Sequence, residues 1–556
     1  MTLNINKVLK LVDSLIINGK ILRAKTLLQE NLRVYPNHSK LTKSLASILG
    51  NQGDIETALS LLRGVSENKD FSWSGFYDLG LLYLKKQKFD EAIQYFKRAL
   101  EKNEGSFETH FYLALALVSK DLFNDAKSHL LIARKINPSS PEVNYNLGRI
   151  FDALGNFDQA CTCYEAATKL NPSFIEAWVN LGLAFYQQGK YQAALESYKT
   201  AIKINNFYQD AWLNMGTTLH ELNQFDEALL AYDWVLKINP NSDVARWNRA
   251  QIDLTVGNFE RGWDGYEYRA YGQYSKLGKY SNIPKAKNLT EIIGKKILVW
   301  HEQGYGDTIQ FSRFLGNLNS LGCQVTLEVP LALLSLMCTL DNCVVVSEIT
   351  EESSFDFQIP LMSLPKLFNI NPYLTKVDIP YLHVKPALVA EWEKRLNIDK
   401  NIVNIGLAVS GSVLHSKNSK RSVRLDELEE ILSFGKFYLL QTELTEIDKA
   451  YLSERSEIVF CGNLINSFQD SAAILKSMDI VISVDTSLAH LSGALNIETI
   501  ILLPWVAEWR WQEKSISTVW YPNTTLCRQD VIGDWNSAVK KIQSKMTGCL
   551  IKGRHY

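Results

Sequence analysis

The sequence predicts an α superhelix of repeated hairpins followed by an α/β region with two parallel sheets. Two observations predict this fold class. A 34-residue period runs through the first half of the 556-residue chain, and such a period is typical of stacked helical repeats. From residue 294 onward, short apolar runs alternate with helical patterns, as in parallel sheets covered by helices. We expect the array over residues 1–270 and a linker over 271–293.

Composition and charge argue against several classes of protein. Hydrophobic residues make up 46% of the chain and charged residues 21%, which is ordinary globular usage. The net charge of −1 argues against a nucleic-acid binder, because such proteins carry a basic excess. No uncharged apolar stretch reaches the ~18 residues of a membrane-spanning helix. Lys10 and Asp13 interrupt the apolar N-terminus, so we expect no signal peptide and a cytoplasmic protein.

Small residues carry the 34-residue period of the first half. One set recurs at Ala24, Ala58, Ala92, Ala126, Ala160, Ala194, Ala228 and Gly262, and a second set at Gly80, Ala114, Gly148, Gly182, Gly216 and Ala250. Small side chains let two antiparallel helices approach closely, and large apolar residues fill the space beside them. Pro138, Pro172 and Pro240 then end helices, since proline lacks the N–H that a helix requires.

Asparagines form a further 34-residue series at Asn146, Asn180, Asn214 and Asn248, with Asp78 in the same frame. Stacked repeats place equivalent positions in a row, so we expect a ladder along one surface. An asparagine amide offers donors and an acceptor, and a ladder of them can bind the backbone of an extended peptide. The alternative is a structural ladder that contacts water or neighbouring repeats.

In period and residue types, the array over roughly residues 5–270 resembles the tetratricopeptide repeat (TPR). In TPR proteins the asparagine position usually faces the concave groove. The ladder resembles that of the O-GlcNAc transferases, which glycosylate polypeptides. The resemblance therefore implies a polypeptide partner in the groove.

Two series of apolar runs predict the strands of the α/β region. The first series covers 295–300, 325–330, 343–348 and 355–361, and the second covers 402–410, 437–441, 457–462, 479–485 and 499–504. Two such series predict two Rossmann-like lobes, over 294–388 and over 389–556, the latter with a terminal helix. Ligands of these folds bind at the carboxyl ends of the strands.

The first strand end carries HEQGYGDTIQFSRF, residues 301–314. Gly304 and Gly306 permit a close approach of the backbone, and Asp307 stands where a helix begins. Asp307 has two interpretations, a catalytic carboxylate or a plain helix N-cap, which aspartate favours. The loop matches neither a P-loop nor a dinucleotide-binding fingerprint.

Two strand ends of the second lobe suit an anion. The first presents hydroxyls, amides and positive charge at Ser410, Gly411, Ser412, Lys417, Lys420 and Arg421. The alternative for this segment is a solvated basic loop. At the second, Asp485 closes a strand, and Thr486 and Ser487 begin a helix whose N–H groups favour an anion. His490 lies one turn further, and the alternative there is a capped helix with a packed histidine.

Six motifs in order carry a further resemblance over residues 294–530. They are EQGYGDTIQFSRF, VSGSVLHSKNSKRS, VDTSLAHLSGAL, LLPWVAEWRW, VWYP and LCRQ. Together they resemble the C-terminal part of bacterial TPR-linked glycosyltransferases, which are related to the heptosyltransferase family. The resemblance implies the GT-B fold, in which two Rossmann-like lobes hold the site between them, the first on the acceptor side and the second on the nucleotide-sugar side.

The resemblance also implies roles for single residues. Asp307 matches the catalytic base of the heptosyltransferases, and Glu302, Gly304 and Gly306 belong to the acceptor loop. Ser410, Ser412 and Lys417 or Lys420 match the donor-phosphate loop, and Asp485, Thr486 and His490 match the donor motif. Ser487 replaces a glycine of that motif, which argues against heptose as the donor sugar.

The leading hypothesis is a nucleotide-sugar-dependent glycosyltransferase whose TPR array recruits a polypeptide acceptor. We expect neither a cofactor nor a metal, because no Asp-x-Asp motif ends a strand and no CxxC pair occurs. One alternative keeps the enzyme but gives it a glycan or lipid-linked saccharide as acceptor, and another is a protein-interaction scaffold with an inactive α/β region. If Asp307 only caps its helix, His301 and Glu302 are the next candidates for the base, since both leave the same strand end.

Overall fold

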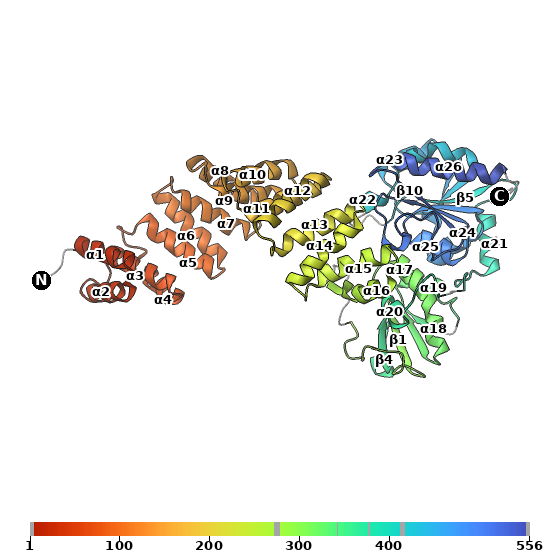
Figure 1. Cartoon of the computed structure of the whole chain (residues 1–556), viewed down its shortest axis with the longest axis horizontal. Coiled ribbons are helices and arrows are strands. Elements are labelled where there is room, and N and C mark those ends of the chain that lie inside the picture. Colours follow the sequence, from red (N-terminus) through yellow and green to blue (C-terminus); the bar gives the residue numbers. More distant parts are fainter. Residues whose placement is uncertain (1–4, 272–278, 342, 376–377, 412–417, 552–556) are drawn as a thin grey trace. The chain divides into compact units, whose positions relative to one another are not determined.

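The computed structural model describes residues 5–271, 279–341, 343–375, 378–411 and 418–551 (Figure 1). The chain divides into two compact units, Met1–Thr218 and Leu219–Tyr556. Ser412 and Lys417, predicted as donor-binding residues, lie outside the described residues.

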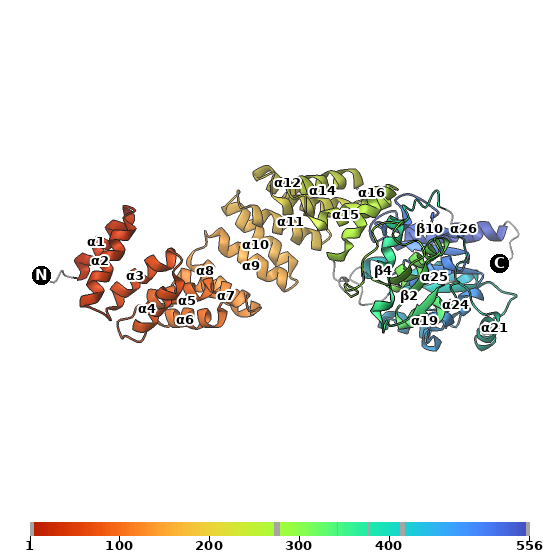
Figure 2. The same cartoon turned by 90° about the horizontal axis from the view of Figure 1, so that it is seen from below.

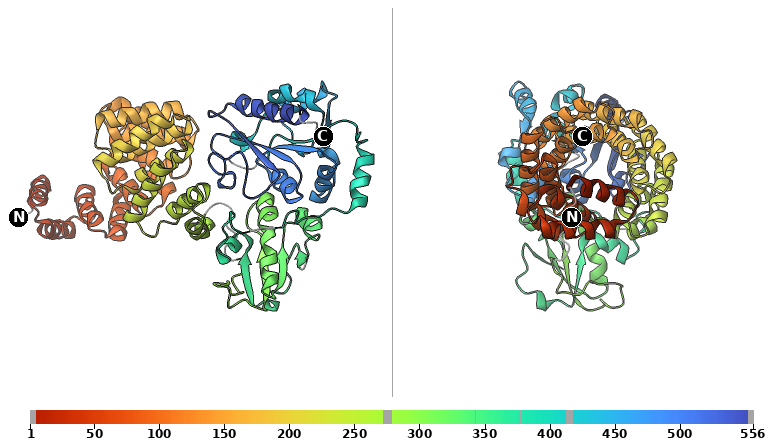
Figure 3. Two further views of the ribbon diagram at one scale, coloured as in Figure 1. Left: turned by 45° about the vertical axis from the view of Figure 1, so that its right-hand side comes forward. Right: turned by 90° about the vertical axis from the view of Figure 1, so that its left-hand side faces the viewer.

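Sixteen α-helices within the described residues form the hairpins of the TPR solenoid. The first helices of the hairpins are α1 (Ile5–Ile17), α3 (Ser39–Asn51), α5 (Trp73–Lys85), α7 (Phe107–Val118), α9 (Pro141–Ala153), α11 (Ile175–Gln187), α13 (Gln209–Glu221) and α15 (Asp243–Thr255). The second helices are α2 (Ile21–Val34), α4 (Ile55–Val65), α6 (Phe89–Lys102), α8 (Phe123–Ile136), α10 (Phe157–Leu170), α12 (Tyr191–Ile204), α14 (Phe225–Ile238) and α16 (Phe259–Tyr266). Within the first unit, successive hairpins stack and curve around a common axis (Figure 3, right).

Close packing of glycine against an aromatic ring explains the period. A Cβ atom added to Gly80 would lie 2.5 Å from the ring of Phe96, and one added to Gly148 would lie 2.5 Å from the ring of Tyr164. In both hairpins the glycine lies on the first helix and the ring on the second. The pairing recurs because each hairpin contacts mainly its neighbours, so the same side-chain packing is required in successive repeats.

Serine N-caps add a second periodic signal that the sequence analysis did not use. The hydroxyl oxygens of Ser72, Ser106 and Ser140 accept hydrogen bonds from backbone N–H groups three residues further, at 3.3, 3.2 and 3.3 Å. Such caps satisfy N–H groups that have no partner within the helix.

The second unit contains two parallel sheets (Figure 2). The first has the order β3-β2-β1-β4, formed by β1 (Lys296–Trp300), β2 (Gln324–Glu328), β3 (Val344–Val346) and β4 (Phe357–Pro360). The second has the order β10-β9-β8-β5-β6-β7, formed by β5 (Asn404–Ala408), β6 (Lys436–Leu439), β7 (Ile458–Phe460), β8 (Ile480–Val484), β9 (Thr499–Leu503) and β10 (Thr524–Arg528).

All nine predicted strands are present within a few residues, and the prediction missed β10. This edge strand reads TTLCR, which is too polar to form the continuous apolar run that marks a buried parallel strand. It pairs with β9 in parallel, so its carboxyl end lies on the same edge as those of the other strands.

Helices cover both faces of the second sheet. Ile405, Phe437, Ile482 and other side chains of one face pack against α26 (Trp535–Ile551) and the 3₁₀ segment Leu425–Phe434. Side chains of the opposite face, among them Val481 and Leu503, pack in a cluster with α24 (Phe468–Lys476) and α25 (Ser487–Ala494).

The last TPR hairpin belongs to the core of the second unit. The Trp263 indole of α16 donates a hydrogen bond to the backbone oxygen of Ile370 at 2.7 Å. Its ring lies 5.4 Å from the ring of Trp509 and 6.4 Å from that of Trp520, measured between centroids. The segment 259–266 departs from the repeat pattern because its aromatic side chains pack in the core of the second unit. Its helix, α16, is only eight residues long.

Candidate functional site

A cavity of about 510 Å³ lies in the second unit where strand ends of the two sheets meet. It is lined by His301, Gln303, Gly304, Tyr305, Gly306, Asp307, Pro330, Gly411, Arg421, Asp485, Thr486, Ser487, His490, Glu508 and Arg510. Residues far apart in the sequence therefore gather at one place, and many of them are residues that the sequence analysis selected.

Asp307 lies in the first turn of α17 (Tyr305–Phe311), not at its N-cap. Gly304 occupies the cap position, and its N–H donates to Asp307 Oδ2 at 2.9 Å. The N-cap interpretation is therefore corrected: the carboxylate reaches back to the cap from the third helical position.

Arg510 connects the two strand ends through three hydrogen bonds. It lies in the 3₁₀ turn Trp509–Trp511 that follows β9, and only 4% of its side chain is exposed. Its guanidinium pairs with Asp307 and Glu508, and its Nε donates to Gln310 Oε1 at 2.6 Å. Arg510, which follows a strand of the second sheet, therefore holds the carboxylate of Asp307, which follows a strand of the first sheet.

Burial dominates the acid–base behaviour of Asp307 and Asp485. Burial raises the pKa of Asp307, while the positive charge of Arg510 opposes this rise. Burial and the nearby Glu508 raise the pKa of Asp485 to about 7, against the attraction of Arg421 and Arg510. Carboxyls whose pKa values are raised in a cavity are typical of functional sites.

His490 is buried on α25 and is held on several sides. Its Nδ1 lies 2.9 Å from the Tyr521 hydroxyl, and its ring stacks on that of Trp511 with centroids 5.3 Å apart. Burial, together with nearby arginines of which Arg510 is the strongest, lowers the pKa of His490 well below its usual range. The imidazole is therefore neutral at physiological pH.

Gly306 lies where α17 packs closely against α25. A Cβ atom there would lie 2.7 Å from His490 Cδ2 and 3.4 Å from the Cα atom of Ser487. Any larger residue would force α17 and α25 apart.

The predicted donor loop is described in part. Gln441 Nε2 donates to Ser410 Oγ at 3.1 Å, and the Gly411 N–H donates to Asn418 Oδ1 at 3.0 Å. A Cβ atom on Gly411 would lie 2.6 Å from Arg421 Nη2, so the glycine leaves room for this arginine on the cavity wall.

Three described residues predicted for the site of the α/β region do not line the cavity, namely Ser410, Glu302 and Lys420. The Glu302 carboxylate accepts a hydrogen bond from the buried Arg269 at 2.7 Å, and Lys420 Nζ lies 2.9 Å from Glu221 Oε2. Neither side chain lines the cavity. Neighbouring residues in a loop point in different directions, and the sequence does not show which of them turns toward the cavity.

The asparagine series is divided between the two units. Asn146 donates to the backbone oxygen of Glu142 at 2.8 Å and accepts from Arg149 at 3.3 Å, whereas Asn180 donates to the Tyr145 hydroxyl at 3.2 Å. Asn214 is half-buried on α13 of the first unit, and Asn248 is half-buried on α15 of the second. Asn146 therefore forms hydrogen bonds within its own repeat, and Asn180 forms one to the preceding repeat.

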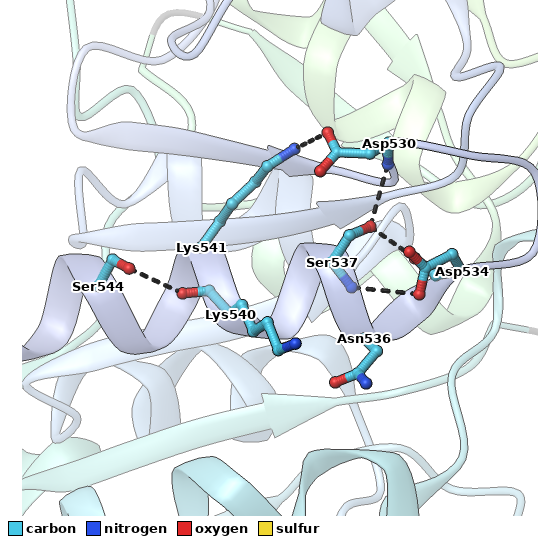
Figure 4. Close-up of a pocket in the computed structure, with 7 residues that line it drawn as sticks. All are labelled: Asp530, Asp534, Asn536, Ser537, Lys540, Lys541 and Ser544. Carbon is cyan, nitrogen blue, oxygen red and sulfur yellow. Dashed lines mark hydrogen bonds and ion pairs between the residues drawn. The ribbon is translucent and has the colours of Figure 1, made fainter.

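A second concave surface lies at the start of α26 (Figure 4). Its volume is about 540 Å³, and it is lined by Asp530, Asp534, Asn536, Ser537, Lys540, Lys541 and Ser544. Lys541 Nζ lies 2.6 Å from Asp530 Oδ1, and the Ser537 N–H donates to Asp534 Oδ1 at 3.3 Å. None of the predicted site residues lies here.

Within the described residues, no cluster of three or more His, Cys, Asp or Glu side chains is arranged to hold a metal ion. In the same part of the chain, no helix combines the length and apolar character that crossing a membrane requires.

Comparisons with known proteins identify the TPR repeats. Models of the tetratricopeptide repeat match residues 73–106, 145–208 and 185–252. No curated protein matches the chain. TPR arrays bind partners on extended concave surfaces, so these repeats imply a role in protein interaction, with a peptide or protein partner.

Several solved structures are similar to the helical part. YrrB, described as a TPR protein with an unusual peptide-binding site, is 21% identical, with coverage of 33% of this chain and 94% of that one and a TM-score of 0.30. MamA is 24% identical, with coverage of 29% and 95% and a TM-score of 0.29. The C-terminal part of a TPR repeat-containing protein from Cytophaga hutchinsonii is 15% identical, with coverage of 42% and 97% and a TM-score of 0.37.

Proposed function

We propose that the chain transfers a sugar from a nucleotide-sugar donor to an acceptor hydroxyl, and that the TPR array recruits a polypeptide as the acceptor. One observation carries the proposal: strand ends of two separate parallel sheets meet at one cavity that contains carboxylates, arginines and a histidine. Its volume of about 510 Å³ lies in the range of small-molecule sites. The two sheets are then the two lobes of a GT-B enzyme.

The second sheet carries the groups proposed for the donor. Arg421 and Arg510 bring positive charge to the cavity, and Ser487 begins α25 there. These groups suit a nucleoside diphosphate, which gains negative charge as the sugar leaves. The arginines supply the charge stabilisation, so the proposed reaction requires no divalent cation.

The first sheet carries the groups proposed for the acceptor. Glycosyl transfer needs a base that takes the proton of the attacking hydroxyl. Asp307 and His301 line the cavity on this side, and both are proton acceptors by residue type. The resemblance to the heptosyltransferases implies Asp307 for this role.

A thermal-shift screen of nucleoside diphosphates and nucleotide sugars tests the proposal. A ligand at 100 times its Kd stabilises the native state by about 2.7 kcal/mol. We expect at least one compound to raise the Tm of the wild type. The Arg421→Gln variant should lose this shift, because Arg421 lines the cavity.

Arg424→Gln is the matched control for this screen. Arg424 belongs to the same basic segment, but it is exposed and pairs with Asp426 at 2.9 Å. It should respond to the ligand as the wild type does. If no nucleotide or nucleotide sugar shifts the Tm of the wild type, the scaffold hypothesis replaces the enzyme.

A further inference from the structure

We infer that Tyr521 is a positioning residue that fixes His490 as a hydrogen-bond donor toward the cavity, and that Arg313 supports Tyr521 in this role. The inference rests on the proposed function and deepens it, because the group that receives the hydrogen bond is the diphosphate of the nucleotide sugar. Tyr521 belongs to the VWYP segment, for which the sequence alone indicates no role.

Tyr521 packs tightly against α25, the helix that carries His490. Only 1% of Tyr521 is exposed, and a Cβ atom on Gly493 of α25 would lie 2.4 Å from Tyr521 Cδ1. The glycine therefore lets the tyrosine ring lie directly on the helix. In this position the Tyr521 hydroxyl lies 2.9 Å from His490 Nδ1.

The Tyr521 hydroxyl is the donor in this contact. Burial raises the pKa of Tyr521 well above its usual range, so the hydroxyl keeps its hydrogen. A buried O–H needs an acceptor, and His490 Nδ1 lies at hydrogen-bonding distance. The neighbouring Tyr381 hydroxyl is already engaged, because it accepts from Arg313 Nη2 at 3.1 Å and donates to the Ile309 backbone oxygen at 3.1 Å. If His490 were the donor instead, the hydrogen of Tyr521 would lose this acceptor.

This hydrogen bond fixes the tautomer of His490. Burial and the positive charge of Arg510 lower the pKa of His490, so the imidazole is neutral. A neutral imidazole has one N–H group and one lone pair. Because the lone pair on Nδ1 accepts from Tyr521, the hydrogen resides on Nε2.

The Nε2 edge of the ring lies on the cavity side of His490. His490 and Gly306 both line the cavity, whereas Tyr521 is not among its lining residues. A Cβ atom on Gly306 would lie 2.7 Å from His490 Cδ2 and 3.5 Å from Nε2, so this edge faces Gly306 while Nδ1 faces Tyr521. Among the residues that the structure describes, none forms a hydrogen bond with His490 Nε2.

Arg313 supports Tyr521 from the segment that follows α17. Only 7% of Arg313 is exposed. Its Nη1 donates to the backbone oxygen of Trp520 at 2.7 Å, and its Cζ atom lies 4.6 Å from the centroid of the Tyr521 ring. Within the described residues, the hydrogen bonds of this guanidinium reach only uncharged oxygens. The nearby positive charge therefore polarises the Tyr521 hydroxyl and strengthens it as a donor.

An N–H group at Nε2 suits the proposed ligand. Arg421 and Arg510 bring positive charge to the cavity, and His490 adds a neutral, directed donor. The oxygens of a nucleotide-sugar diphosphate only accept hydrogen bonds, so a lone pair at Nε2 would repel them. The hydrogen bond from Tyr521 therefore decides whether His490 attracts or repels the diphosphate.

The tautomer of His490 can be measured in the full chain without a substrate. Nitrogen NMR spectra of protein with isotope-labelled histidine distinguish a protonated ring nitrogen from one with a lone pair. The signals that a His490→Gln variant lacks assign His490. We expect the hydrogen on Nε2 in the wild type, and a mixture of tautomers in Tyr521→Phe, which removes only the hydroxyl. A wild type with the hydrogen on Nδ1 would overturn the inference, whether or not any variant folds.

Affinity for the nucleotide sugar that the thermal-shift screen selects gives a second readout. Tyr521→Phe should weaken binding by about tenfold, the effect of one hydrogen bond to a charged ligand, as measured by titration calorimetry. Tyr438→Phe is the matched control. Tyr438 is fully buried in the second sheet and donates to Asn404 Oδ1 at 3.2 Å, away from the cavity lining. This variant should bind as the wild type does.

A double variant separates a positioning role of Tyr521 from a structural one. A glutamine amide always carries N–H donors, so it needs no partner to fix a tautomer. In the His490→Gln background, Tyr521→Phe should therefore change affinity by less than about twofold, because the two residues act as a pair.

Two binding results would overturn the inference while the glycosyltransferase stands. One is a Tyr521→Phe variant that binds the nucleotide sugar as tightly as the wild type. The other is a loss that remains about tenfold in the His490→Gln background, which would show that Tyr521 acts through the fold and not through His490. A wild type that binds no nucleotide sugar contradicts the proposed function itself, and the tautomer of His490 then still tests the hydrogen bond from Tyr521.

Discussion

Ion pairs in the two units of the chain differ in how deeply they are buried. In the first unit, ion pairs such as Lys120–Asp90 lie at the surface, with 40% and 77% of the side chains exposed. In the second unit, the Arg510–Asp307 pair is largely buried, with 4% and 18% exposed. Burial of an ion pair costs solvation energy that the attraction often fails to return.

This difference distinguishes a region built on packing from one that buries charged groups around a cavity. The repeats obtain their stability from small residues against rings, such as Gly148 against Tyr164. The strand ends instead bring charged side chains such as Asp307 and Arg510 to the cavity. Groups of this kind in a cavity are typical of a site that binds or transforms a charged ligand.

The largest effect should follow removal of the buried arginine. Arg510→Gln leaves Asp307 and Glu508 without their common partner, and breaking a buried pair costs about 3–5 kcal/mol. The pKa of Asp307 should also rise further, because Arg510 lowers it. Chemical denaturation followed by tryptophan fluorescence measures the loss. Lys541→Gln, which breaks an exposed pair with Asp530, should change stability by at most about 1 kcal/mol.

Two glycine-to-alanine substitutions compare the two regions directly. Gly148→Ala and Gly306→Ala each place a Cβ atom too close to a buried ring, and overpacking of this kind costs about 1–3 kcal/mol. Only Gly306→Ala should weaken nucleotide-sugar binding, because it separates α17 from α25. Calorimetry and titration of both variants measure the contrast. Gly64→Ala on α4, with open space around it, should be neutral or stabilising; a loss as large as that of Gly148→Ala would show that the ring contact is not the cause.

Donor affinity should depend on pH through Asp485. Its pKa of about 7 means that it loses a proton as the pH rises from 6 to 8. The new negative charge disfavours a diphosphate, so binding should weaken by up to about tenfold, the factor that corresponds to one pKa unit. A nucleotide sugar is the suitable probe, because its diphosphate does not titrate in this range. Asp485→Asn should flatten the pH dependence of donor affinity. An unchanged pH dependence in this variant would show that another group causes it.

Burial of Asp485 should also affect stability with the opposite sign from a paired aspartate. Its pKa is higher in the folded than in the unfolded chain, so the folded state binds the proton more tightly. Stability should therefore fall as the pH rises from about 4 toward 7. Asp485→Asn removes this contribution, and unfolding midpoints at several pH values measure it.

The smallest effect per residue belongs to the asparagine series. Replacing Asn146, Asn180, Asn214 and Asn248 by alanine should weaken transfer to a protein acceptor, since each lost hydrogen bond contributes about 0.5–1.5 kcal/mol. Donor hydrolysis should remain, because the cavity is unchanged. Equal losses of both activities would indicate misfolding, and no loss of either would make the series structural.

The repeat half was predictable because small residues recur at equivalent, tightly packed positions of successive hairpins. Ala58 belongs to one 34-residue series and Gly148 to the other, and both lie in tightly packed positions. The apolar strands were predictable because buried parallel strands need continuous hydrophobic runs. The edge strand β10 carries no such signal.

The site was predictable only in its separate segments. Asp307 and Asp485 follow strands, which the sequence shows, but Arg510 reaches Asp307 from the opposite sheet. The contact of His301 Nδ1 with Glu328 Oε2, at 2.8 Å, depends on the pairing of β1 with β2. Strand order and register are properties of the folded sheet, so the sequence does not reveal these contacts.

Photoaffinity labelling tests most directly that the strand-end cavity is the nucleotide site. The full chain is irradiated with azido-substituted uridine and adenosine diphosphates, and the labelled peptides are identified by mass spectrometry. We expect label in segments that line the cavity, around Tyr305, Arg421 and Ser487, and its loss when unmodified nucleotide sugar competes. Label that resists competition, or that falls on the α26 surface around Lys540, would contradict the assignment of the cavity.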